Sequence, residues 1–200
     1  MELTPDGLAP MFLLLLMVVA AYAAGSVNFS ILLFRLLGRA DPREHFSGNP
    51  GVSNVYRQAG PAWAAAVLSL DLLRAAAVAL LSVRLCSPDR LGWCALALVA
   101  GNMFPLFHGF RGGKGVANYL GYTAVVSPWA ALLAAWVWLV IFSILRVPFL
   151  GSFGMVAALS VGLAHRGGFS APALVAVAAV TALIITAHRS NLSRLKKPSS

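Results

Sequence analysis

Charged residues are scarce in this sequence, and acidic residues are the scarcer kind. Charged side chains make up 10% of the 200 residues, whereas a soluble domain carries about a quarter. So few polar groups argue against a water-soluble fold. Six Asp and Glu against 15 Lys and Arg leave a net charge of +9. Because the basic residues lie in short loops between apolar runs, we attribute this charge to membrane topology and anionic ligands, and not to nucleic acid.

Cysteine is also rare. Cys86 and Cys94 are the only two, and no Cys or His set has the spacing of metal ligands. We therefore expect unpaired thiols, no metal and no cofactor. Residues 1–10 lack the basic start of a signal peptide, so the first apolar run is expected to remain as a membrane span.

Long apolar runs make up most of what is present. Runs of about 18 or more apolar residues are typical of transmembrane helices, and lipid favours helices because backbone groups must pair internally. We predict an all-α, polytopic membrane protein with about seven transmembrane helices in a single domain, residues 1–200. The fourth segment is short and carries Asn118, Tyr119 and Tyr122, so we expect a partial or protein-enclosed helix. The predicted segments are 9–37, 61–83, 91–109, 116–127, 129–145, 149–165 and 169–187.

Basic residues favour one orientation of these segments. With the N-terminus outside, 11 of the 15 basic residues fall on the inner side and three, Arg84, Arg90 and Arg166, on the outer side. This bias predicts a cytoplasmic C-terminus. Arg74 lies within the second segment beside Asp71, and we expect an internal ion pair there. The inner residues are Arg35, Arg39, Arg43, Arg57, Arg111, Lys114, Arg146, Arg189, Arg194, Lys196 and Lys197.

That orientation brings several polar elements to the inner side, and the first is the glycine-rich run from Arg111 to Gly115. Its glycines, Gly112, Gly113 and Gly115, permit positive φ and a close approach to a ligand. Successive N–H groups could then line an anion nest at the start of a helix, and Lys114 adds a charge. A basic turn at the membrane edge is the alternative. The run is not a Walker A loop, because Gly115 stands where Ser or Thr is needed.

A second element runs from Ser47 to Arg57. Ser and Asn side chains can hold hydroxyl or phosphate oxygens, and Arg57 can pair with phosphate bidentately. A connecting loop rich in turn formers is the alternative. The members in question are Ser47, Gly48, Asn49, Asn54 and Arg57.

A third element runs from His188 to Arg194. A helix would place His188 and Asn191 on one face, and His can carry a proton or contact phosphate. A basic tail that binds lipid headgroups is the alternative. Ser152, between Gly151 and Gly154, is a weaker candidate because small residues often serve helix packing.

The ordered set of motifs resembles the PlsY-type family of acyl-phosphate:glycerol-3-phosphate acyltransferases, over nearly the whole chain. The resemblance implies a seven-span fold in the bacterial inner membrane and transfer of a fatty acyl group from acyl phosphate to the 1-hydroxyl of sn-glycerol 3-phosphate. Lysophosphatidic acid and phosphate would be the products. The resemblance makes Ser47, Arg57, Lys114, Ser152, His188 and Asn191 catalytic. It makes Gly48, Asn49, Asn54, Arg111, Gly112, Gly113, Gly115 and Arg194 contacts to substrate or phosphate.

Two other functions stay open at this point. Glycine-interrupted spans with basic residues also fit a transporter or binding protein for an organic phosphate, although no repeated halves are visible. Asn102 stands where the family usually has His, so an inactive paralogue is the other alternative.

Overall fold

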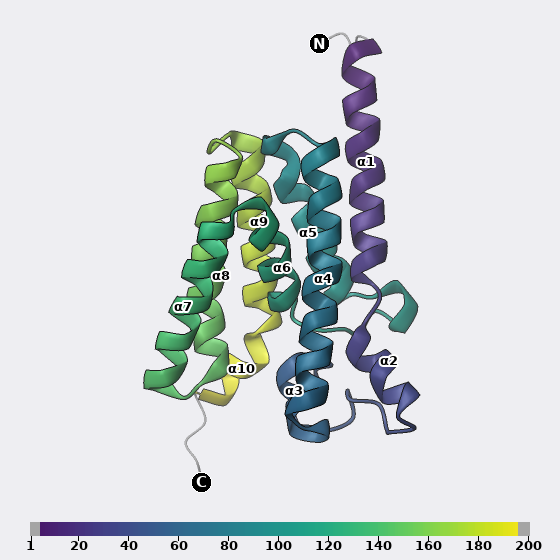
Figure 1. The fold of residues 1–200 in the computed structure, drawn as a ribbon, viewed down its shortest axis with the longest axis vertical. Helices are drawn as coiled ribbons and strands as arrows, with labels where there is room; N and C mark the ends of the chain where they lie inside the picture. Colours follow the sequence, from purple (N-terminus) through teal and green to yellow (C-terminus); the bar gives the residue numbers. More distant parts are fainter. Residues whose placement is uncertain (1–4, 196–200) are drawn as a thin grey trace.

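The computed structural model describes residues 5–195, with side chains for residues 9–193, and every regular element within that range is helical. Figure 1 shows that α1, α4, α5, α7, α8 and α9 run roughly along the long axis of the molecule. The helices are α1 (Pro5–Gly25), α2 (Phe29–Leu36), α3 (Val52–Ala59), α4 (Pro61–Leu85), α5 (Leu91–Met103), α6 (Val116–Val126), α7 (Pro128–Leu145), α8 (Pro148–Arg166), α9 (Ala171–Ala187) and α10 (Arg189–Leu195), with short 3-10 turns η1 (Pro88–Arg90) and η2 (Leu106–His108).

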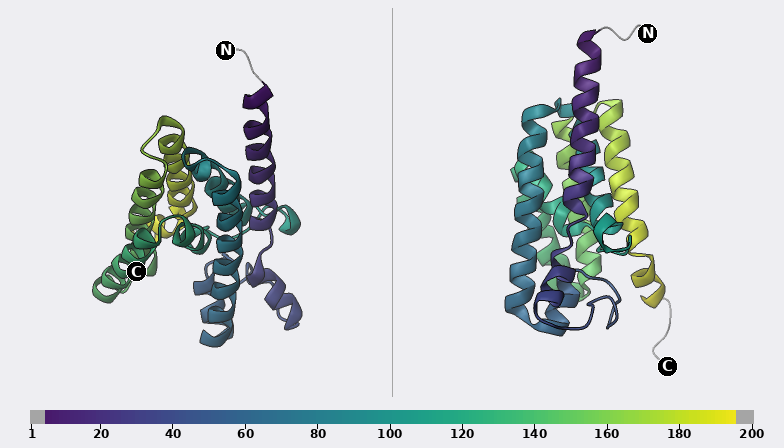
Figure 2. Two further views of the ribbon diagram at one scale, coloured as in Figure 1. Left: turned by 45° about the horizontal axis from the view of Figure 1, so that its top comes forward. Right: turned by 90° about the vertical axis from the view of Figure 1, so that its right-hand side faces the viewer.

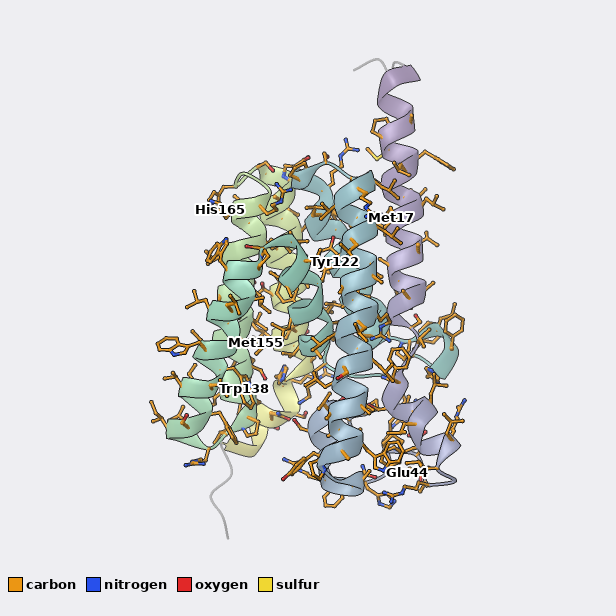
Figure 3. All side chains as sticks on the ribbon, viewed as in Figure 1. Met17, Glu44, Tyr122, Trp138, Met155 and His165 are labelled. Atoms are coloured by element: carbon orange, nitrogen blue, oxygen red, sulfur yellow. The ribbon has the colours of Figure 1, made fainter. Side chains whose placement is uncertain are left out.

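The two ends of the bundle differ. α2, α3 and α10 gather at the end opposite the start of α1, which projects beyond its neighbours (Figure 2). Glu44, in the loop between α2 and α3, marks this end, and His165, in the last turn of α8, lies near the other (Figure 3). The Ser47 loop and α10 therefore belong to the end that holds Glu44.

Apolar helices long enough to cross a membrane confirm a multi-pass, all-α protein. Five stretches meet that length, and α9 is apolar but shorter. α6 has 11 residues and a length of about 16 Å, against a hydrocarbon core of about 30 Å. All seven predicted segments are helical, but five are long enough to span. These five are Ala9–Leu36, Pro61–Leu85, Pro88–His108, Pro128–Leu145 and Pro148–Arg166.

The first span is broken, which the apolar run 9–37 does not reveal. α1 ends at Gly25 and α2 begins at Phe29. Asn28 is the N-cap of α2, because its Oδ1 accepts the Ile31 N–H at 3.1 Å. Ser, Asn and similar residues favour such caps since their side chains satisfy backbone donors at a helix start. The prediction of one continuous segment is therefore corrected to two helices.

α6 is enclosed by protein, as its polar residues predict. It packs against α4, α5, α7 and α8, and Asn118, Tyr119 and Tyr122 are all buried. The Tyr122 hydroxyl donates to Leu91 O at 2.9 Å in the middle of the molecule (Figure 3). Tyr119 pairs with the Ser160 hydroxyl at 3.2 Å. These bonds satisfy polar groups that lipid could not.

Small residues let α1 and α5 touch backbone to backbone. A Cβ on Gly25 would overlap Leu98 O, and one on Gly101 would overlap Tyr22 O. Close approach at small residues is a usual way to pack helices in lipid, where no hydrophobic effect drives the helices together. The contact fixes the end of α5, and the glycine-rich segment is built on that end.

Candidate active site

The glycine-rich segment, residues 109–115, lies against the end of α5. Gly112 N–H donates to Met103 O at 3.0 Å, and Gly113 N–H donates to Asn102 O at 2.9 Å. A Cβ on Gly112 would overlap the Asn102 carbonyl oxygen. These glycines are therefore needed for a close backbone contact within the protein.

This contact uses two of the N–H groups that were predicted to line an anion nest. The N–H groups of Gly112 and Gly113 already have backbone acceptors, so they are not directed at a ligand. Gly115 takes a positive φ of 79° and starts α6, which has no side-chain cap. A helix start leaves N–H groups unsatisfied and favours an anion. Within residues 112–116, the start of α6 is therefore better suited to an anion than the N–H groups of Gly112 and Gly113.

Lys114 lies at this start and reaches across to the end of the chain. Its Nζ donates to Asn191 Oδ1 at 2.8 Å, a contact between residues 77 apart in sequence. Both side chains are partly buried. A cation at the positive end of a helix is retained only at a cost, so the arrangement is suited to a negatively charged ligand.

His188 follows α9 and is buried, with 3% of its surface exposed. Its Nδ1 lies 2.8 Å from Ile184 O, and because a carbonyl only accepts, Nδ1 carries the proton and Nε2 is the free acceptor. Burial lowers the pKa of His188, and the charge of Lys114 lowers it further, against the opposing effect of the Ile184 bond. The Phe153 ring packs edge-on at 5.3 Å. His188 is thus a neutral imidazole that can accept a proton.

The loop before α3 is held by hydrogen bonds from the buried side chain of Asn54. Asn54 is 2% exposed, and its Nδ2 donates to Pro42 O at 2.8 Å and to His45 O at 3.3 Å. Its amide donors are therefore used to fold the loop. Asn54 Oδ1 is buried without a hydrogen-bond partner among the described residues, so the substrate contact assigned to Asn54 from the sequence stays a prediction.

Arg43 ties that loop to the glycine-rich segment. Its Nη2 pairs with Asp41 Oδ2 at 2.6 Å, and its Nη1 donates to His108 O at 2.7 Å and Arg111 O at 2.9 Å. The Arg43 guanidinium lowers the pKa of Asp41 through the side-chain hydrogen bond. Sequence analysis places Arg43 among the inner basic residues but not in the site. The Asp-Pro-Arg spacing before the Ser47 motif was the available signal.

The remaining predicted residues differ in burial. Ser47 and Asn49 are partly buried, and Asn49 Oδ1 is buried without a hydrogen-bond partner in the described part of the chain. Ser152 Oγ donates to Pro148 O at 3.2 Å within α8, next to the Phe153 that touches His188. Gly48 (φ 67°), Arg57 and the Arg111 side chain are exposed. The side chain of Arg194 lies outside the described residues.

The expected internal ion pair is present. Arg74 Nη2 lies 2.8 Å from Asp71 Oδ1, and both side chains are largely buried between helices. The same nitrogen donates to Asn118 Oδ1 at 2.6 Å. Asn118 lies in the first turn of α6, four residues after Lys114, and sequence analysis does not assign it to the site.

Comparison with known proteins matches most of this chain to one family. The family model described as "Glycerol-3-phosphate acyltransferase" matches residues 15–198. The chain is 37% identical over 186 residues to the glycerol-3-phosphate acyltransferase of Shewanella halifaxensis, covering 92% of each chain. It is 38% identical over 186 residues to that of Anaeromyxobacter sp., covering 90% of this chain and 92% of the relative.

Two solved structures share the fold. One is the crystal structure of PlsY (YgiH), an integral membrane glycerol 3-phosphate acyltransferase, in its glycerol 3-phosphate form, with a TM-score of 0.84, 38% identity and 91% coverage of both chains. The other is the lysphosphatidic acid form, with a TM-score of 0.79, 36% identity and the same coverage. The likeness therefore extends over sequence and fold together.

Proposed function

This chain belongs to the glycerol-3-phosphate acyltransferase family, and on that premise we propose that it moves a fatty acyl group from acyl phosphate to the 1-hydroxyl of sn-glycerol 3-phosphate. The family, the fold and the apolar helices make it a multi-pass membrane acyltransferase. The acyl-phosphate donor, the bacterial inner membrane and a site on the cytoplasmic side are part of the proposal. The relatives favour acyl transfer over the transporter considered from sequence.

The reaction needs little covalent help from the protein. The acceptor hydroxyl oxygen attacks the acyl carbonyl carbon, the bond from that carbon to the phosphate oxygen breaks, and phosphate leaves with the electron pair. The hydroxyl proton passes to a base. Because an acyl phosphate is a mixed anhydride with a good leaving group, positioning and charge stabilisation account for most of the rate.

The observation that carries the proposal is the cluster formed by Lys114, Asn191 and His188. Lys114 and the start of α6 supply positive charge for a phosphate. His188 Nε2 is an acceptor on a neutral ring, which is the form required to orient or deprotonate a hydroxyl. Asn191 holds Lys114 at 2.8 Å and so sets where the charge lies.

The reaction brings two phosphate groups together, one on each substrate. The loop before α3 is proposed to bind the phosphate that Lys114 does not hold. Ser47, Asn49 and Arg57 carry polar groups on this loop and on α3, and Arg43 fastens the loop to the glycine-rich segment. The buried, unpaired Asn49 Oδ1 leaves one acceptor for a substrate hydroxyl. Ser152 lies beside the Phe153 that packs on His188, which supports a place near the reacting groups.

The test is an acyl-transfer assay with purified protein in nanodiscs. Acyl phosphate and radiolabelled glycerol 3-phosphate should give labelled lysophosphatidic acid and one phosphate per product, whereas acyl-coenzyme A should give none. Lys114→Ala should lower kcat/KM by about 100-fold, as loss of a charge-stabilising donor does. Arg84→Ala, an exposed cation at the far end of α4, is the matched control and should retain activity.

Four outcomes would contradict the proposal. Product with acyl-coenzyme A alone would refute the donor. Equal rates for wild type and Lys114→Ala would refute the site. Uptake of glycerol 3-phosphate into proteoliposomes without acylation would favour the transporter, and binding without turnover would favour an inactive paralogue.

A further inference from the structure

The break in the first span exposes one peptide group, that between Val27 and Asn28, to an apolar interior. Residues 26–28 belong to no helix, and the stretch Ala9–Leu36 that contains them is one of the apolar spans. Backbone groups at this depth must find partners within the protein. The partners of this peptide group therefore show what the break is attached to.

Two side chains from different parts of the chain hold this peptide group. Arg74, on α4, donates its Nη1 to the Val27 carbonyl. His108, in η2, accepts the Asn28 N–H at its Nε2, at 3.4 Å. Both side chains are largely buried. The carbonyl and the N–H of a single peptide unit are thus fixed from opposite directions.

The two side chains that hold this peptide group are each connected to a residue close to Lys114 in sequence, one before it and one after it. His108 ends η2, which leads directly into the glycine-rich segment, and lies six residues before Lys114. Arg74 reaches Asn118 Oδ1 at 2.6 Å, four residues after Lys114 and one turn into α6. Asp71 holds Arg74 at 2.8 Å, and the Phe29 ring lies 5.0 Å from its guanidinium carbon. Arg74 therefore joins α4, the broken span and the first turn of α6.

We propose that Arg74 is a positioning residue for the acyl transfer, which sets the start of α6 and hence Lys114 without touching substrate. Buried charges in a membrane helix are costly and are retained where they have a specific role. Only a planar guanidinium serves Asp71, Asn118 and the Val27 carbonyl at once, because its five N–H donors point in fixed directions. This inference rests on the proposed role of Lys114 in holding phosphate.

The test compares Arg74→Lys, Asn118→Ala and the double variant in the same nanodisc assay. Lys keeps the charge opposite Asp71, and Asn118→Ala leaves the ion pair whole, so both variants should keep a Tm close to that of wild type. Each should lower kcat/KM by about 10- to 100-fold, as a small misplacement of a reacting group does. The loss should lie mainly in KM for glycerol 3-phosphate. Arg84→Lys, on the same helix and exposed, is the control.

The double-variant cycle separates positioning from general stability. If Arg74 acts through Asn118, the double variant should be no worse than either single one, whereas independent structural losses would multiply. Multiplied losses, losses that track a fall in Tm, or unchanged activity in Arg74→Lys would overturn the inference. If Lys114→Ala is as active as wild type, the proposed site fails first. If Lys114→Ala is inactive and Arg74→Lys is normal, only this inference fails.

Discussion

The close packing of the glycine-rich segment on α5 can be tested by one methyl group, in Gly112→Ala. A Cβ there would lie 2.6 Å from Pro105 Cδ and would overlap Asn102 O. Carbon atoms normally approach to about 3.5–4.0 Å, so the segment must move by about 1 Å. Its neighbours are backbone and a proline ring, which cannot turn away. Overpacking of this kind costs about 1–3 kcal/mol.

The displacement reaches the proposed site, because Lys114 is two residues further along. A shift of about 1 Å in a positioned group lowers the rate by up to about 100-fold. We therefore expect Gly112→Ala to fold with reduced Tm and to lose about two orders of magnitude in kcat/KM. The measurements are thermal unfolding in detergent and the acyl-transfer rate in nanodiscs.

Gly167→Ala is the matched control for Gly112→Ala. Its Cβ would lie 2.5 Å from Ala173 Cβ and 3.4 Å from Pro88 O, at the far end of the bundle from Lys114. It should lower Tm by a similar amount and leave kcat/KM near that of wild type. If Gly112→Ala keeps the wild-type rate, or if Gly167→Ala loses as much activity, the argument from close packing is refuted.

Four further perturbations, one of pH and three of sequence, probe other contacts. In the proposed reaction His188 is the base, and its pKa lies below the usual histidine value, so kcat/KM should stay level below pH 6.5 and fall only as the pH drops through that lower pKa. A decline that begins at the ordinary histidine pKa would contradict this. Removing the charge of Lys114, as in Lys114→Gln, should move the acid limb of the residual activity to higher pH. Arg43→Ala removes two hydrogen bonds from Nη1, one to His108 O and one to Arg111 O. It should cost about 10-fold in kcat/KM, since hydrogen bonds from charged groups contribute about 1.5–3 kcal/mol each and the loop is held by other bonds too. An unchanged rate would show that Arg43 is dispensable. Gly101→Leu should separate α1 from α5 and lower Tm by several degrees in a detergent melt, and an unchanged Tm would show that this contact contributes little.

Local composition was enough to predict several features. The apolar runs predict helices because lipid leaves backbone groups no partner but each other. Asn118, Tyr119 and Tyr122 predict that α6 is enclosed, and the structure buries all three. The pairing of Asp71 with Arg74 follows from their spacing and the cost of lone charges in lipid. The motif order also identified the family that the comparisons then matched.

Other features depend on contacts between distant residues. Gly25 and Ser26 lie in an unbroken apolar run, and the break that follows them is stabilised by Arg74 and His108, which bind the freed peptide group. The glycines of residues 109–115 are equally compatible with an anion nest or with close packing. At Gly112 the structure shows close packing against the end of α5. No local sequence pattern distinguishes an anion nest from close packing, because both require the same backbone freedom of glycine.

The sequence by itself determined that this protein is a helical membrane protein, and it predicted that the basic, glycine-rich segments share one side of the membrane, because hydropathy and charge act residue by residue. Only the tertiary structure decided which of those segments meet. It joined Lys114 to Asn191 across 77 residues, gave His188 its neutral form through burial and turned Asn54 and Arg43 into the supports of a loop. These outcomes depend on distances between side chains from different helices, and such distances exist only once the helices have packed.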